Sequence, residues 1–131
     1  MAAMDRADVF RRFHEAWTDG DLEEVLDLTD PEIVVRPVHG WLFSRLEYHG
    51  HDGLTQWFRE MKDPWDSFET LVDEVHPTDN GGVMGFLRLV AHRGDETLDA
   101  RVASFAEFRD GRIVTITARD IWDVQEEMDR N

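Results

Sequence analysis

The chain has 131 residues, no cysteine and a formal net charge of −15, from 29 acidic and 14 basic residues. This length fits one domain with a single core, so we expect residues 1–131 to form one domain. A field this negative repels phosphate polyanions and anionic lipids, so we expect no nucleic-acid partner and no membrane partner. The absence of cysteine excludes disulfides and thiolate sites, and the N-terminus lacks a basic-then-apolar leader pattern. We therefore expect a cytoplasmic protein.

Apolar residues in the first half of the chain are spaced as on helices. The first helix is expected over residues 5–19, and its apolar face comprises Val9, Phe10, Phe13, Ala16 and Trp17. Asp21 followed by Glu24 resembles a capping box, which predicts a second short helix. Asp52 can cap a third helix that Pro64 ends. The apolar face of this third helix comprises Leu54, Trp57, Phe58 and Met61.

The rest of the chain is typical of strands. One strand is expected from Glu32 to Val38, followed by a loop over residues 39–50. From Ser67 onward a period of two predicts strands at 68–76, 82–92, 98–109 and 112–120. A few helical residues are expected at 123–129. Helices followed by antiparallel strands predict an α+β domain, in which helices over the concave side of a curved sheet leave a cone for a small molecule.

The last expected strand carries a candidate acid. Val114, Ile116, Ala118 and Asp120 alternate onto one side of it, so an apolar stripe ends in a carboxylate. At the mouth of a cavity, burial would raise the pKa of this carboxylate, which suits a general acid or base. The alternative is a strand end in solvent, or a salt bridge to Arg119 with no catalytic role.

Arg88 is a second candidate. It shares a strand face with Phe86 and Val90, and arginine beside apolar neighbours is seldom left unpaired inside a protein. We therefore expect Arg88 either to pair with a carboxylate such as Asp120 or to face solvent.

The histidines of the middle segment invite a metal hypothesis. His49 and His51 are two residues apart, with Asp52 adjacent and His39 on the same irregular segment. Cupin-like metal sites use such a spacing in all-β chains, whereas this chain opens with helices, so we expect no metal. His39 or His49 is instead a candidate auxiliary proton carrier, and His14 is expected to be exposed to solvent beside the buried helix face.

Four strings in chain order resemble one known superfamily. They are Phe13–Leu22, Asp30–Ile33, Tyr48–Leu54 and Phe108–Val114. Together they resemble the NTF2-like, SnoaL-like superfamily over nearly the whole chain. The resemblance implies an NTF2-like cone with N-terminal helices packed on a curved, mostly antiparallel sheet. It does not fix an activity, because this fold hosts isomerases, cyclases, dehydratases, epoxide hydrolases and non-catalytic modules.

The chain departs from two catalytic patterns of this superfamily. Ketosteroid isomerases use a tyrosine and two acids, and the matching positions here are Phe13, Ser104 and Arg36. The stretch Arg119–Asp123 is similar to the closing stretch of limonene-type epoxide hydrolases, so Asp120 matches one acid and Arg88 falls near the arginine. The partner acid of those enzymes falls at Val90. The resemblance therefore excludes the usual ketosteroid isomerase and leaves half of the epoxide hydrolase machinery.

The favoured hypothesis is a SnoaL-like small-molecule enzyme that uses cofactor-free acid/base chemistry on an apolar, carbonyl-bearing substrate. Cyclisation, isomerisation and hydration or hydrolysis all fit, with Asp120 as the acid/base and Arg88 as its orienting or oxyanion partner. The expected pocket residues are Phe13, Trp17, Trp57, Met61, Phe86, Ser104, Ile116 and Ala118. The alternative is a non-catalytic ligand-binding or dimerising module. A homodimer through the outer sheet face is expected because strand 82–92 is apolar on both faces.

Overall fold

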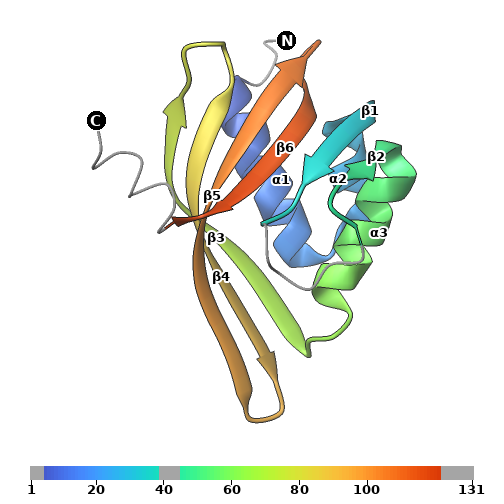
Figure 1. The fold of residues 1–131 in the computed structure, drawn as a ribbon, viewed down its shortest axis with the longest axis vertical. Coiled ribbons are helices and arrows are strands. Elements are labelled where there is room, and N and C mark those ends of the chain that lie inside the picture. Colours follow the sequence, from blue (N-terminus) through green and yellow to red (C-terminus); the bar gives the residue numbers. More distant parts are fainter. Residues whose placement is uncertain (1–4, 39–44, 122–131) are drawn as a thin grey trace.

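The computed structural model describes residues 5–38 and 45–121, which form three helices and six strands (Figure 1). The helices are α1 (Arg6–Asp19), α2 (Leu22–Asp27) and α3 (Gly50–Lys62). The strands are β1 (Thr29–Arg36), β2 (Tyr48–His49), β3 (Ser67–Pro77), β4 (Val83–Arg93), β5 (Glu96–Arg109) and β6 (Arg112–Asp120). The helical segment expected at 123–129 lies outside the described residues.

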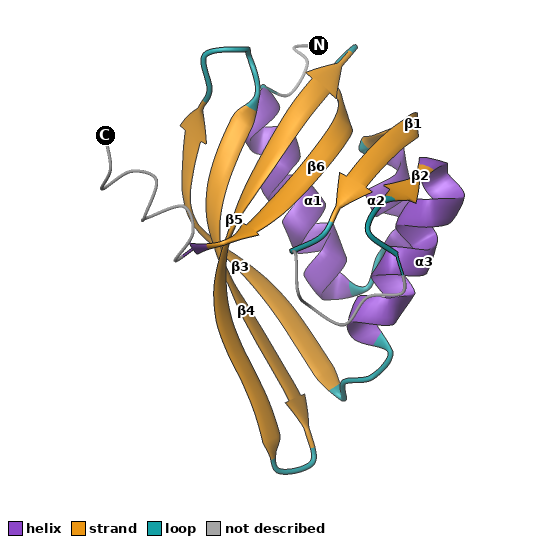
Figure 2. Cartoon of the chain, in the orientation of Figure 1, coloured by secondary structure: helices purple, strands orange, loops and turns teal. Residues whose placement is uncertain are grey.

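The strands form one sheet in the order β2-β1-β6-β5-β4-β3. Neighbouring strands are antiparallel except β1 and β6, which run parallel. The sheet is curved, and the helices gather against one side of it, as Figures 1 and 2 show. The expected α+β architecture, with N-terminal helices on a curved and mostly antiparallel sheet, is confirmed.

Helix α1 begins and ends as its sequence indicates. The Asp5 side chain accepts a hydrogen bond from the Asp8 backbone N–H at 2.8 Å, which caps the first turn. Gly20 ends the helix with a φ of 75°, a left-handed conformation that glycine adopts without a Cβ penalty. The buried residues between these ends are Val9, Phe10, Phe13, His14, Ala16 and Trp17.

Two expected boundaries were wrong. β1 begins at Thr29 rather than Glu32, because the strand continues through Pro31 where its register with β6 shifts. α3 begins at Gly50 rather than after an Asp52 cap, and the residue before it, His49, makes no side-chain capping hydrogen bond. The loop expected over residues 39–50 also contains the two-residue strand β2.

A bulge in β6 changes which residues face the core. Glu107 of β5 pairs with Thr115 while Phe108 pairs with Ile113, so Val114 is an extra residue on β6. Ile113 is fully buried and Val114 only partly buried. We expected Val114 to begin the inward stripe, and this was wrong because the bulge shifts the alternation by one residue.

The face of β4 that we assigned to the pocket was also wrong. Leu87 and Leu89 lie on the helix-covered face, and each is 3% exposed. Phe86 and Arg88 therefore lie on the outer face. Because both faces of β4 carry apolar residues, alternation alone did not decide which of them the helices cover.

Gly85 on β4 allows α1 to lie close to the sheet. A Cβ built on Gly85 would fall 2.5 Å from Cζ of Phe10, far inside van der Waals contact. The Phe10 ring is 1% exposed and thus occupies the space that a side chain at position 85 would need. The seating of α1 therefore depends on this glycine.

We predict that Gly85→Ala lowers the free energy of unfolding by about 1–3 kcal/mol, because the added methyl overpacks against Phe10. Urea unfolding followed by circular dichroism measures the loss. In a Phe10→Leu background the same Gly85→Ala change should cost much less, because the smaller side chain yields. Equal costs in the two backgrounds would contradict the clash between these two residues.

Candidate functional site

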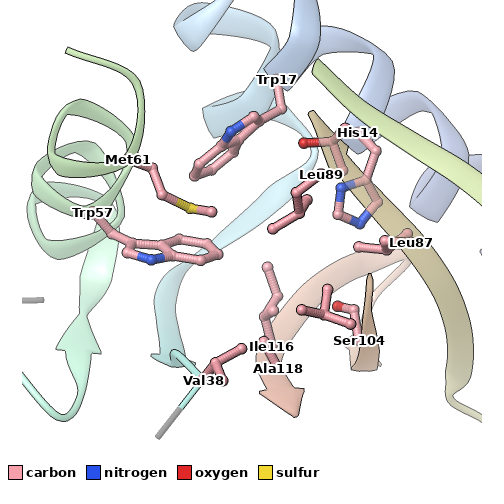
Figure 3. A pocket seen from close by; sticks show the side chains of 12 residues that line it. His14, Trp17, Val38, Trp57, Met61, Leu87, Leu89, Ser104, Ile116 and Ala118 are labelled. Atoms are coloured by element: carbon pink, nitrogen blue, oxygen red, sulfur yellow. The ribbon is translucent and has the colours of Figure 1, made fainter. Parts of the chain in front are cut away.

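A cavity lies between the helices and the inner face of the sheet (Figure 3). Twelve described residues line it: His14, Trp17, Val38, Trp57, Met61, Thr70, Leu87, Leu89, Val102, Ser104, Ile116 and Ala118. Helices α1 and α3 supply the aromatic side, and strands β3 to β6 supply most of the rest. The cavity thus lies where the expected cone has its interior.

The cavity is narrow. The cavity contains about 460 Å³ of space that no atom fills, and this figure includes solvent at the mouth of the cavity. The centre of a water-sized sphere can reach about 40 Å³ of this space. By that second measure it holds roughly three waters. A ligand larger than this would have to displace side chains such as Met61, whose flexible thioether adapts readily.

His14 is the titratable residue of the cavity wall. Its side chain projects from α1 and is 7% exposed, with its ring centroid 4.7 Å from that of Phe10 and 5.1 Å from that of Phe13. Burial among these rings disfavours the charged imidazolium and lowers the pKa of His14 to about 3. The imidazole is therefore neutral at pH 7. In this form it offers one N–H donor and one nitrogen acceptor.

The expectation that His14 is exposed was wrong. His14 lies four residues after Phe10 and three before Trp17, which places it on the same helical face as both. This spacing was the signal that could have identified it. A polar residue at this spacing on an apolar helical stripe is expected to belong to the buried face.

Six of the eight expected pocket residues line the cavity: Trp17, Trp57, Met61, Ser104, Ile116 and Ala118. Phe13 is 1% exposed and belongs to the core behind the cavity wall. Phe86 lies on the outer face, where its ring centroid is 6.2 Å from that of His76. Sequence reasoning missed the other lining residues, which are His14, Val38, Thr70, Leu87, Leu89 and Val102.

Asp120 lies on the inner face of β6, beyond the residues that line the cavity. It pairs across the sheet with Val102, a lining residue, and residues paired in this way share a face. The carboxylate is partly buried and stands two residues beyond Ala118, a strand distance of about 7 Å. Asp120 also borders an open polar cleft where β6 ends and β5 continues, together with Arg88, Asp99, Ala100, Arg101 and Ile121.

The other expected catalytic residues lie elsewhere. Arg88 forms a bidentate ion pair with Asp99 on the outer face, with nitrogen–oxygen distances of 2.6 and 3.0 Å. The hydrogen bonds from Arg88 lower the pKa of Asp99. Of the two expected alternatives, pairing with a carboxylate or a solvent-facing position, the structure combines both, and the partner carboxylate is Asp99 of the adjacent strand. His49 is exposed, with Nε2 3.3 Å from a Glu47 oxygen, and His39 lies outside the described residues.

Comparison with known families decides the classification. Residues 10–116 match the family model described as the SnoaL-like domain. The chain belongs to the SnoaL-like domain family. No curated protein matches its sequence significantly.

Solved structures share the SnoaL-like fold with this chain. Bal32a from a soil-derived mobile gene cassette is 24% identical, with a TM-score of 0.79 and 86% of each chain covered. An LEH-like epoxide hydrolase of M. tuberculosis is 18% identical, with a TM-score of 0.72, covering 98% of this chain and 92% of that chain. The protein RV0760c of Mycobacterium tuberculosis, in complex with estradiol-17beta-hemisuccinate, is 15% identical, with a TM-score of 0.73, covering 88% of this chain and 93% of that chain. At these identities the similarity shows the fold alone.

Within residues 5–38 and 45–121, no group of three or more His, Asp or Glu side chains is arranged to hold a metal ion. No described helix is both long and apolar enough to cross a membrane.

We predict that burial of neutral His14 makes stability depend on pH. In the unfolded chain His14 binds a proton near the ordinary histidine pKa of 6.5, whereas in the folded chain its pKa is about 3. The free energy of unfolding therefore falls as the pH decreases from about 6.5 towards 3. The wild type should lose about 2 kcal/mol between pH 7 and pH 5 from this residue. Urea unfolding at both pH values measures the loss.

His14→Gln should remove most of that pH dependence. The matched control is His76→Gln, which changes a histidine whose side chain is 52% exposed and should leave the dependence unchanged. If His14→Gln and the wild type lose the same free energy of unfolding between pH 7 and pH 5, His14 is not held neutral by folding.

Proposed function

We propose that the protein binds a small, largely apolar molecule in the cavity and acts on it by cofactor-free proton transfer. The observation that carries this proposal is an apolar cavity whose wall includes a neutral imidazole, with a carboxylate two residues beyond the lining residue Ala118 on the same strand face. Binding sites of small molecules typically combine an apolar wall with a few placed polar groups. Cyclisation, isomerisation and hydration each require such proton transfer.

In this proposal His14 and Asp120 have different roles. A neutral imidazole is a poor base where protonation is costly, but its N–H can polarise a carbonyl oxygen, as in other enzymes with a neutral histidine. The Asp120 carboxylate then takes a proton from the carbon next to that carbonyl. The electrons of the broken C–H bond move to the oxygen held by His14, and the proton returns from Asp120 to carbon in the product. Arg88 has no part in this proposal because it is committed to Asp99.

The ligands of structural neighbours support the binding half of the proposal. RV0760c was crystallised with estradiol-17beta-hemisuccinate, and another neighbour is an LEH-like epoxide hydrolase. We infer by analogy that this chain also takes an apolar ring compound. A second candidate is a binding module without catalysis, which is favoured by the position of Asp120 outside the set of cavity-lining residues.

Proton transfer can be tested without knowing the natural substrate. We predict that the protein accelerates the uptake of deuterium by 2-indanone at the carbon next to its carbonyl, because this exchange requires only an acid/base and a polarising donor. Proton NMR in deuterated buffer measures the exchange rate. Asp120→Asn keeps the shape of the side chain and removes its titration, so the acceleration should fall at least about tenfold.

Asp99→Asn is the matched control, since it changes a carboxylate on the outer face and should leave the exchange rate unchanged. An exchange rate unaffected by Asp120→Asn would remove Asp120 from the mechanism. If the wild type binds the ketone and does not accelerate exchange at all, the non-catalytic binding module becomes the better account.

We also propose a symmetric homodimer through the outer face of the sheet. Three apolar residues of β4 and β5 on that face, Met84, Phe86 and Phe105, are only partly buried within one chain. Since the helices cover the other face, a second copy would give these side chains a cover.

Light scattering should therefore give a dimer mass for the wild type at micromolar concentration. Phe86→Glu should shift the mass to that of a monomer. In the dimer the new carboxylate would face either the same carboxylate of the second copy or apolar side chains, and both arrangements are unfavourable. Leu46→Glu is the control, since Leu46 is 80% exposed and belongs to no sheet strand. A monomer mass for the wild type would contradict the proposal.

A further inference from the structure

Two buried hydrogen-bond donors on the cavity wall have no protein partner. The indole Nε1 atoms of Trp17 and Trp57 are inaccessible to solvent and make no hydrogen bond with any described residue. Trp17 is 3% exposed and Trp57 is 7% exposed, and both line the cavity. They come from different helices, α1 and α3, so one local distortion does not account for both.

These unpaired donors carry an energetic cost. An indole N–H can only donate, and a buried donor without an acceptor costs about 1–3 kcal/mol. Phenylalanine would provide an aromatic ring without this cost. The two rings are neighbours, with centroids 4.7 Å apart at an angle of 56°, so the two indoles form one corner of the cavity wall. Figure 3 shows this corner on the helix side, with Met61 beside the two indoles.

The cavity wall also lacks a charge. None of the described lining residues is Asp, Glu, Lys or Arg. His14 is neutral at pH 7, because burial lowers its pKa to about 3. A charged ligand group of either sign would lose its hydration there without gaining a counter-charge. An anion is further opposed by the net charge of −15 on the whole protein.

We propose that Trp17 and Trp57 form a donor subsite that selects uncharged ligands bearing an acceptor oxygen, such as a ketone, ester or ether group. An indole N–H donates to that oxygen while the apolar wall covers the rest of the ligand. This inference rests on the proposed function, because it names the class of molecule that the same cavity takes. It also assigns two specificity residues that are separate from the proton-transfer pair His14 and Asp120.

A rival ligand class follows from the same aromatic corner. Indole faces attract cations, and Trp17 also contacts Phe58 at a centroid distance of 4.8 Å. An amine would satisfy the ring faces and leave both indole N–H donors unpaired. Preferential binding of an amine would therefore contradict the donor subsite.

Four compounds on one ring skeleton distinguish these classes: 2-indanone, indane, 2-aminoindane and indane-2-carboxylate. At pH 7 they present a neutral acceptor, no polar group, a cation and an anion, respectively. Ligand-observed NMR titration gives their dissociation constants without relying on tryptophan fluorescence. The wild type should bind 2-indanone about three- to tenfold more tightly than indane, the factor that one net hydrogen bond supplies, and should bind both charged compounds more weakly than indane.

Tryptophan variants assign the preference to its donors. Trp57→Phe, Trp17→Phe or the double variant should reduce the preference for 2-indanone over indane severalfold, to what the His14 N–H alone supplies, while the affinity for indane stays within about twofold. Trp65→Phe is the matched control, since Trp65 does not line the cavity and instead stacks under the Arg93 guanidinium at 5.2 Å. That control should keep the wild-type preference.

Three outcomes would overturn the donor subsite: equal affinity of the wild type for 2-indanone and indane, a preference that is undiminished in the double variant, or tightest binding of the amine or the carboxylate. If indane binds in any of these cases, the apolar cavity of the proposed function stands and only the subsite fails. If none of the four compounds binds, the proposed cavity function fails, and the subsite fails with it.

Discussion

The approach of α1 to the sheet depends on a single missing side chain. The Phe10 ring occupies the volume above Gly85, so the helix can lie close to β4. Phe10, His14 and Trp17 lie along the same helical face. The distance at which Phe10 packs against the sheet therefore also sets how closely His14 and Trp17 approach the sheet. The positions of the imidazole and of one indole in the cavity are therefore consequences of how closely the helix packs.

The second helix of the cavity is held to the first by polar contacts at its end. Lys62, the last residue of α3, donates hydrogen bonds to the carbonyl oxygens of Trp17 and Thr18 at the end of α1. These carbonyls are among those that a helix leaves unpaired at its C-terminus, so the ammonium also interacts favourably with the helix dipole. The contact brings together the helix ends that carry Trp17 and Met61. The aromatic corner of the cavity is thus built from two helices that are fixed to each other.

The sequence predicted the architecture well because its signals were local. The capping residue Asp5 and the terminating Gly20 each act within a few residues. The same reasoning placed Trp17 and Trp57 on the apolar faces of their helices. Six expected pocket residues line the cavity for this reason, although lining a cavity does not by itself test a role in function.

The errors arose where the answer depended on distant parts of the chain. Both faces of β4 are apolar, so only the packed helices decide that Leu87 faces inward and Arg88 outward. The extra residue at Val114 is defined by its partner strand, which alternation along β6 cannot reveal. His14 was assigned to solvent on its residue type, although its position on the helix indicated burial. Long-range packing outweighed local pattern for Leu87 and Val114, whereas for His14 the local helical pattern was the correct signal.

The parallel pairing of β1 with β6 has a consequence for synthesis of the protein. Ribosomes produce β1 early and β6 after all the other described strands, yet the two lie side by side in the finished sheet, with Thr29 opposite Ile113. Ile116 and Ala118 of β6 form one wall of the cavity. Until that strand emerges, the apolar faces of the early helices have no complete sheet to cover them. The wall of the cavity is therefore incomplete until the last described strand is made, and apolar surface left open in the incomplete domain favours aggregation.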